Sequence, residues 1–488
     1  MTVAHQSDAI EDCENRQQER TPLPKFQLFI IFLIQFAEPI TATVIAPFVN
    51  QFVRDTGVIR GDERRTGYYA GIIGSAFFFS EALTVFHWGR ISDWVGRRPV
   101  LLLGPIGLSF AMLSFGLSTS FWSMLASRCV QGVFNGNIGV SKVVLAEITD
   151  STNIGDAFAM VSLVWSFGSS IGPILGGILS QPATRWPFLF GKISLFRDHP
   201  YFLPCAAASL LAFASGAIAF ISLKETLPSA VAQQKIDGQM NSSVEAAKSN
   251  TDSTTRLLED HDSVDYGSSE GSNVSRESRR RSSSTILDTE QPPPFKALLT
   301  PQVIITLSVY TFLAFVDMSS QILLPLVYST SIPLGGLGFD AYQIGVILGV
   351  WGVINVIVQL SFLGNLIRRF GPTKVHIFSQ CSYVWNIGLY PLLSFLVKRS
   401  GRVDAKVWTV MIVQLALRLT NNMAYGSIQV LIVDVAPNRA SLGATNGLAQ
   451  ALGCVGRSIA PAAISAFTAE EATITPKGPA YKQPHAHY

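Results

Sequence analysis

Long apolar stretches alternate with short polar turns along most of the chain. Each stretch holds about 20 mainly apolar residues, and a helix of that length, rising about 1.5 Å per residue, crosses a hydrocarbon layer of about 30 Å. The predicted spans of the first set are 26–49, 67–88, 99–119, 122–146, 157–180 and 201–223, and those of the second set are 302–328, 342–366, 374–397, 407–433 and 441–467. The pattern predicts an all-α polytopic protein embedded in the lipid bilayer.

The two sets of spans predict two helical bundles in one chain. We expect a cytoplasmic tail at 1–25, a six-helix bundle at 26–223, a disordered cytoplasmic linker at 224–300, a second bundle at 301–467 and a polar tail at 468–488. The second bundle has five predicted spans, so a twelfth helix is expected to be missing from a layout of six plus six. The linker is polar and poor in aromatic residues, so it cannot bury enough surface to fold alone. Its sequence RRRSSS suits a kinase that phosphorylates Ser282 to Ser284.

Composition supports the membrane assignment and excludes several functions. Charged residues make up 14% of the chain, against roughly a quarter in soluble domains. The net charge of +3 is too small to predict nucleic-acid binding. The five cysteines have no CxxC spacing, so we expect no disulfide framework, no metal site and no cofactor. No nucleophile constellation or phosphate-binding loop is present either, which argues against an enzyme.

Basic residues in short loops predict the orientation of the bundle. The turns at 89–98 and 367–374 and the amino-terminal tail are basic and fall on one side, which we assign to the cytoplasm. One loop disagrees, because 53–66 places four arginines on the opposite side, partly offset by acidic residues. The sequence leaves open whether the membrane is the plasma membrane or the vacuolar membrane.

The turn after the second span is unusually rich in charge and glycine. It contains Gly89, Asp93, Gly96, Arg97 and Arg98. Glycines permit a tight turn, and residues four apart on a helix, such as Asp93 and Arg97, face each other. The corresponding turn of the second set, LGNLIRRFG at 363–371, keeps the glycines and the basic residues but lacks the aspartate.

The fifth span carries a face of small residues, formed by Gly168, Gly172, Gly176 and Gly177. Such faces allow close packing of helices, and Pro173 among them removes a backbone hydrogen bond and bends the helix.

Ionisable residues inside spans are costly and therefore point to function. Glu38 lies near the middle of the first span, where Pro39 can unwind the helix locally, and Asp317 lies at the corresponding place in the second set. Both are candidate proton carriers. Arg128, with Gln131 on the same helix face, either reaches out to the interface or acts on a carboxylate or an anionic substrate.

Three motifs together resemble those of the major facilitator superfamily: GRISDWVGRR between the second and third spans, RCVQG in the fourth and GSSIGPILGG in the fifth. The fifth-span motif is similar to that of the drug:proton antiporters. The stretches AEPITATVIAP (37–47) and LAEITD (145–150) resemble the tetracycline-resistance and zinc-induced-facilitator-like group. The resemblance implies two six-helix halves that rock about a central cavity. It also implies that the charged turn is a latch that holds one state of the cavity.

We therefore expect a proton-coupled antiporter that exports a small organic molecule by alternating access. Two alternatives remain at this point. LKETLP (223–228) loosely resembles a sugar-porter element, which suggests a sugar or nutrient importer of the same fold. The missing span suggests a truncated, non-transporting regulatory remnant.

Overall fold

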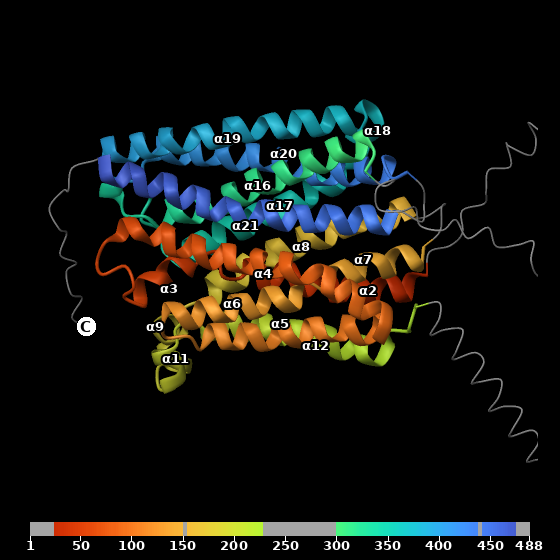
Figure 1. Ribbon diagram of the computed structural model, residues 1–488. Coiled ribbons are helices and arrows are strands. Elements are labelled where there is room, and N and C mark those ends of the chain that lie inside the picture. The colour runs from red at the N-terminus through yellow and green to blue at the C-terminus, as the bar shows by residue number, and fades with distance from the viewer. Residues whose placement is uncertain (1–23, 150–153, 228–298, 438–441, 475–488) are drawn as a thin grey trace, which may run out of the picture.

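The computed structural model describes residues 24–149, 154–227, 299–437 and 442–474. Within these residues every regular element is a helix, and the long helices run side by side with nearly parallel axes (Figure 1). The predicted all-α fold is confirmed. The linker residues 228–298, including Ser282 to Ser284, and the terminal residues 475–488 lie outside the described part, so the kinase target and the missing twelfth helix stay predictions.

The first half of the chain, red to yellow-green in Figure 1, forms the lower part of the molecule in that view. Its elements are α2 Lys25–Thr43, α3 Val49–Asp55, η1 Glu63–Arg65, α4 Thr66–Val95, α5 Arg97–Gly116, α6 Phe121–Asn135, α7 Ile138–Glu147, α8 Ile154–Leu179, α9 Pro182–Arg185, α10 Pro187–Phe190, α11 Ser194–Asp198 and α12 Phe202–Ser222.

The second half, green to blue, lies above it. Its elements are α16 Pro301–Ser329, η2 Ile332–Leu334, α17 Ala341–Val358, the π-helical turn η3 Gln359–Leu363, α18 Gly364–Phe370, α19 Pro372–Ser400, α20 Ala405–Asp434 and α21 Leu442–Ile474. α21 runs beyond 467, where the sequence predicts its end, because the Ala- and Glu-rich residues that follow are good helix formers.

Two of the predicted spans are broken helices. The first span divides into α2 and α3, but Pro39 does not cause the break: it lies inside α2, which continues to Thr43. The chain leaves the helix only at 44–48, around Pro47, whose ring has no N–H to donate to an earlier carbonyl. The fourth span divides into α6 and α7 at Gly136 and Asn137.

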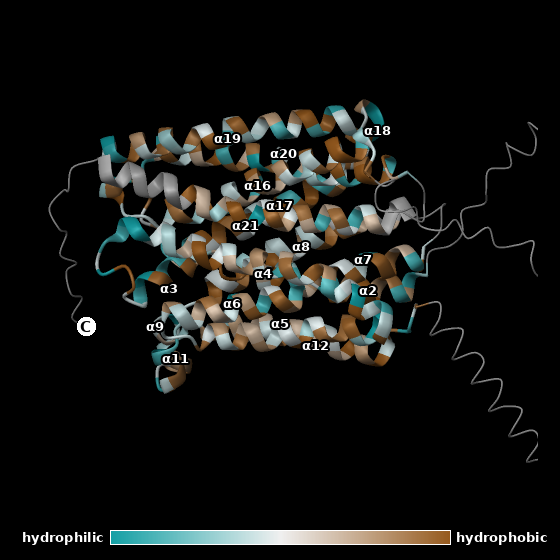
Figure 2. Cartoon of the chain, viewed as in Figure 1, coloured by the Kyte–Doolittle hydropathy of each residue, from teal (hydrophilic) through white to brown (hydrophobic). Residues whose placement is uncertain are grey.

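The surface of the helices suits a membrane. Six helical segments among the described residues are long and apolar enough to cross one. Figure 2 shows apolar residues along the lengths of the helices and hydrophilic residues gathered at their ends, as at α3 and α18. The chain is therefore an integral membrane protein.

Each half has cores of its own. One apolar cluster of the first half surrounds Ile31 and Leu101, and one cluster of the second half surrounds Tyr328 and Leu393. All buried members of these two clusters come from a single half. Each half can therefore move as a unit without opening these cores.

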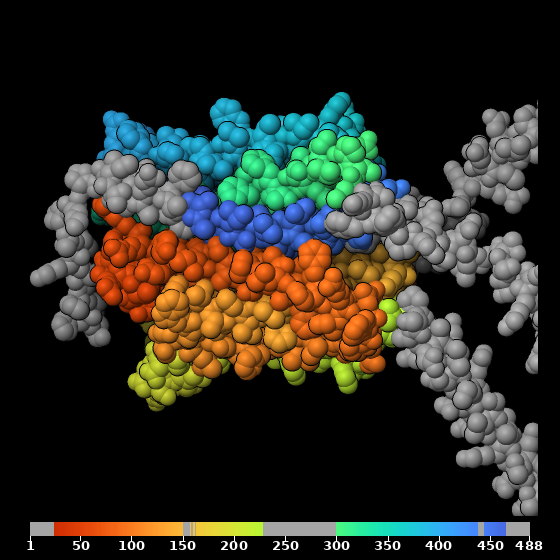
Figure 3. Space-filling view, in the orientation of Figure 1, coloured from red at the N-terminus to blue at the C-terminus, as the bar shows by residue number. Residues whose placement is uncertain are grey.

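The halves meet along two helix pairs, α4 with α21 and α8 with α17. Figure 3 shows α21 seated directly on α4. At the crossing of α8 and α17 the backbones nearly touch, because a Cβ atom added at Gly177 would lie 2.5 Å from the Cα of Gly345. Only glycine at both positions permits this approach.

Polar contacts also join the halves at the end of the molecule that carries η1, which we call the Glu63 end. Glu63 accepts hydrogen bonds from the backbone N–H and the hydroxyl of Ser331, at 3.1 and 2.8 Å. Glu63 also lies 3.7 Å from the guanidinium of Arg54. The Arg185 guanidinium stacks 3.9 Å from the ring centre of Tyr342 in the other half. The arginine-rich loop that disagreed with the predicted orientation thus contributes to the contact between the halves.

Candidate functional site: a cavity between the halves

A cavity of about 150 Å³ lies between the two halves. Both halves contribute to its wall, which includes the polar residues Gln35, Glu38, Lys142, Asp317, Arg418 and Arg457 and the aromatic residues Trp165, Tyr310, Trp351 and Tyr425. A concave site with aromatic walls and a few convergent polar groups is typical of a small-molecule site.

Glu38 is held in the wall by a neutral partner. α2 places the side chain in the bundle interior, where the residue is 5% exposed. Asn135, at the end of α6, donates a hydrogen bond of 3.0 Å to its carboxylate. Within the described residues Glu38 forms no ion pair. Its carboxylate can therefore take up a proton without breaking a salt bridge.

Asp317 is held in the same way in the second half. The Tyr383 hydroxyl donates to one carboxylate oxygen at 2.9 Å, and the Gln321 amide donates to the other at 2.7 Å. Asp317 likewise has no ion pair in the described part of the chain. The cavity thus receives one carboxylate from each half, and each has only neutral hydrogen-bond donors.

A second group of buried and partly buried polar residues crosses between the halves, and most of its members line the cavity. The Gln450 amide donates to Glu81 at 3.1 Å and accepts from the ammonium of Lys142 at 2.8 Å. Arg457 lies nearby on α21, enclosed by aromatic rings. The candidate residues predicted from the sequence did not include Glu81, Lys142 and Arg457. The signal was present, because each is an ionisable residue within a predicted span, the criterion that selected Glu38 and Asp317.

Arg128 and Gln131 lie away from the cavity. Neither belongs to the cavity lining. Arg128 is 3% exposed, so it does not reach out to the membrane interface. Its guanidinium donates to Gln131 at 2.5 Å and lies 4.6 Å from the ring centre of Phe77. In this structure the pair joins α6 to α4.

The glycines of the fifth span seat α8 against two different helices. Cβ atoms added at Gly168, Gly172 and Gly176 would lie within 2.4 Å of atoms of Pro39, Thr43 and Val44 respectively. These three glycines therefore pack on the carboxyl-terminal end of α2. Gly177 points instead to α17, as described above, and Pro173 lines the cavity.

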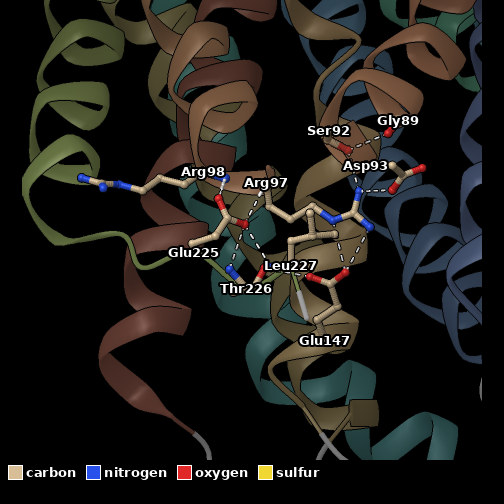
Figure 4. Close-up of polar contacts among 9 residues, drawn as sticks. All are labelled: Gly89, Ser92, Asp93, Arg97, Arg98, Glu147, Glu225, Thr226 and Leu227. Carbon is tan, nitrogen blue, oxygen red and sulfur yellow. Dashed lines mark hydrogen bonds and ion pairs between the residues drawn. The ribbon is translucent and has the colours of Figure 1, made fainter. Parts of the chain in front are cut away.

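The charged turn forms a dense network at the opposite end from Glu63, which we call the latch end (Figure 4). Gly96 has a φ of 108°, a conformation that favours glycine, and it joins α4 directly to α5. Arg97 is 2.6 Å from Asp93 and 3.1 Å from Glu147, at the end of α7. It also donates to the hydroxyl of Ser92 at 2.6 Å. Gly89 supplies a backbone carbonyl to that hydroxyl.

Glu225, just after α12, completes the network. Its carboxylate accepts hydrogen bonds from the backbone N–H groups of Arg97, Arg98, Thr226 and Leu227, at 2.9 to 3.0 Å. Partial burial raises the pKa of this carboxyl, but the four backbone donors outweigh it and hold the pKa below its usual range. The Arg98 guanidinium donates to a carbonyl of α12 at 2.7 Å.

All the partners drawn in Figure 4 belong to the first half. The network therefore joins α4, α5, α7 and the segment after α12, and these contacts do not bridge the two halves. Asp93, Arg97 and Arg98 were predicted from the sequence, whereas their partners Glu147 and Glu225 were not. Both lie in the stretches LAEITD and LKETLP, which carried family resemblance but were not paired with the arginines.

The described residues contain no group of three or more His, Cys, Asp or Glu side chains that could hold a metal ion.

Comparison with known proteins assigns the family. The model of the Major Facilitator Superfamily matches residues 31–461. The chain is 33% identical to the major facilitator-type transporter psiT2 of Psilocybe cyanescens, over 95% of this chain and 87% of that protein. It is 31% identical to the multidrug transporter mfsB of Aspergillus fumigatus, over 90% and 77%. It is 28% identical to Protein ZINC INDUCED FACILITATOR-LIKE 1 of Arabidopsis thaliana, over 93% and 87%.

Solved structures agree with the fold. The crystal structure of the human organic anion transporter MFSD10 (TETRAN) aligns with a TM-score of 0.57 at 18% identity, covering 92% of this chain and 95% of that one. Two helical halves, a cavity between them and the matched sequence lead to one conclusion: the chain belongs to the Major Facilitator Superfamily and resembles its multidrug and zinc-induced-facilitator-like transporters.

Proposed function

We propose that the protein is a secondary active transporter that exports a small organic molecule in exchange for protons. The observation that carries this proposal is the pair of cavity carboxylates, Glu38 and Asp317, one from each half. Because their hydrogen-bond partners are neutral, a proton and a cationic group of a substrate compete for the same carboxylate. Competition for one site is what an antiporter needs, since the two ligands must not bind together.

Export is supported by a relative named as an efflux pump, azaK of Aspergillus niger, which is 25% identical over 93% of this chain. Alternating access is supported by the contacts between the halves, which include the crossing at Gly177 and Gly345 and several polar bonds and which leave the two cores described above within single halves. We further propose that the Arg97 network keeps the helices of the first half together while that half moves. We also propose that the latch end is the cytoplasmic end and that the linker is cytoplasmic, because the turn at 89–98 is rich in basic residues.

The test is proton flux in proteoliposomes. The purified chain is reconstituted with a pH-sensitive dye inside, and a panel of organic cations such as ethidium is added under a pH gradient. We expect substrate-dependent proton movement that Glu38→Gln abolishes and that Asp198→Asn, a carboxyl-to-amide change at an exposed position, leaves intact. Proton-coupled flux that survives in Glu38→Gln would remove Glu38 as the proton carrier.

A further inference from the structure

Positive side chains line the cavity as well as negative ones, and Glu81 lies next to them, bound to Gln450. Lys142, Arg418 and Arg457 line the cavity together with the two carboxylates. Among the described residues, none of these three cations forms an ion pair. An unpaired cation in a desolvated site is costly, so a ligand that supplies an acid group there gains affinity.

Arg418 makes only weak hydrogen bonds with the protein. Within the described residues these bonds go to the carbonyl and the hydroxyl of Ser320, at 3.4 and 3.5 Å, which is at the limit of a hydrogen bond. Lys142, in contrast, donates to Gln450 at 2.8 Å. Arg418 therefore has donor capacity left for a ligand.

The surroundings of Arg418 favour a flat, acidic ligand. Its guanidinium lies 5.0 Å from the ring centre of Trp351, which also lines the cavity. An arginine stacked on a ring keeps the edge of its planar fork available for a carboxylate or a phosphate. The ring of Trp351 offers an apolar face to an aromatic part of the same ligand.

A carboxylate stands one helical turn from this acid-binding position. Ser320, which contacts Arg418, comes three residues after Asp317 on α16, a rise of about 4.5 Å. The two charged groups of a ligand that reaches both must be separated by only a few bonds.

We propose that the cavity takes a small aromatic zwitterion, whose acid group binds Arg418 and whose ammonium binds Asp317. This rests on the proposed proton antiport and names its substrate class. A simple anion does not suit antiport, because protonation of the carboxylates would strengthen its binding and move both ligands together. A simple cation would leave Arg418 unpaired. A zwitterion satisfies the arginine and still competes with a proton for the carboxylate.

Three probes with one indole ring test the proposal. Tryptamine carries the amine, indole-3-propionate carries the acid and tryptophan carries both. Binding to the full chain in lipid nanodiscs is measured by titration calorimetry in buffers of different ionisation enthalpy, which also reports the protons released. We expect tryptophan to bind at least tenfold more tightly than either other probe, with proton release.

Variants of Arg418 provide the second arm. Arg418→Gln should reduce tryptophan affinity at least tenfold, to that of tryptamine, and leave tryptamine binding unchanged. Arg418→Lys keeps the charge but loses the fork, so it should recover part of the affinity and shows that the site tolerates substitution. Arg369→Gln is the matched control, because Arg369 also lies over a ring, Phe370, but does not line the cavity.

The proposal is overturned if tryptamine or indole-3-propionate binds as tightly as tryptophan, if none of the three binds, or if Arg418→Gln weakens all probes equally. If the zwitterion proposal fails but proton-coupled ethidium flux is seen in the parent and not in Glu38→Gln, the proposed antiport still holds. If the parent chain shows no proton-coupled flux with any compound tested, the proposed antiport itself is overturned.

Discussion

The Glu63 contact makes a quantitative prediction about the balance between states. Glu63→Gln removes the charge that strengthens two hydrogen bonds from Ser331 in the other half. Hydrogen bonds to charged groups contribute about 1.5–3 kcal/mol each, and the side chain is 30% exposed, which weakens both. Because glutamine still accepts one bond, we expect a loss of about 1.4 kcal/mol in total, which is a tenfold change in an equilibrium constant.

The ratio of open to closed molecules at the Glu63 end should therefore rise about tenfold. Spin labels at Arg60→Cys and Arg402→Cys, one exposed position in each half, report the separation by pulsed electron resonance in nanodiscs. Asp62→Asn is the matched control. Asp62 pairs with Arg65 at 3.3 Å and binds the backbone of Arg64, so its contacts stay within the loop.

Two results would refute this reasoning. The first is an unchanged distance distribution in Glu63→Gln. The second is an equal shift in Asp62→Asn, which would mean that loop charge in general, and not the bond to Ser331, holds this end closed. Ser331→Ala adds a further check, because the double variant should show less than the sum of the single effects.

Three other predictions concern the first half. Glu147→Gln should lower the midpoint temperature of thermal unfolding more than Asp93→Asn does, because the Glu147 side chain is 21% exposed and that of Asp93 is 58% exposed. Labelling of the buried cysteines with a thiol-reactive dye during heating measures this midpoint. Glu225 has a lowered pKa in the folded state, so its ionised carboxylate stabilises the folded protein fully above the usual glutamate pKa. This stabilisation is lost as the pH falls through the pKa of the folded state. Glu225→Gln should therefore unfold at a lower temperature than the parent at pH 7, and the difference between their midpoint temperatures should shrink below about pH 4. Gly132→Ala should cost about 1–3 kcal/mol, seen as a lower midpoint, because its Cβ would lie 2.1 Å from the rigid backbone carbonyl of Phe77.

The sequence predicted the helices well because lipid imposes a simple rule on them. Every span of about 20 apolar residues became a helix or a pair of helices, and the ionisable residues Glu38 and Asp317 line one cavity. The same rule applied evenly would also have selected Glu81, Lys142 and Arg457.

Contacts between segments that lie far apart in the sequence could not be predicted from it. Glu63 and Ser331 are 268 residues apart, and nothing in either local sequence indicates that they meet. The role of Glu225 was equally hidden, because its carboxylate accepts hydrogen bonds from backbone N–H groups at the start of α5, which the fold brings next to the end of α12. The sequence predicts local unwinding at Pro39, but the helix continues through Pro39 and the first span breaks near Pro47, since a proline inside a bundle can keep its helix when the surrounding packing holds the chain.

The contact of Gly177 with Gly345 offers a practical tool. Each methyl group added at this crossing would act as a wedge between two helices whose backbones already touch. Gly345→Ala should thus shift the protein toward the state that is open at the Glu63 end. Such a protein would be a suitable immunogen for raising antibody fragments that recognise one state of the transport cycle.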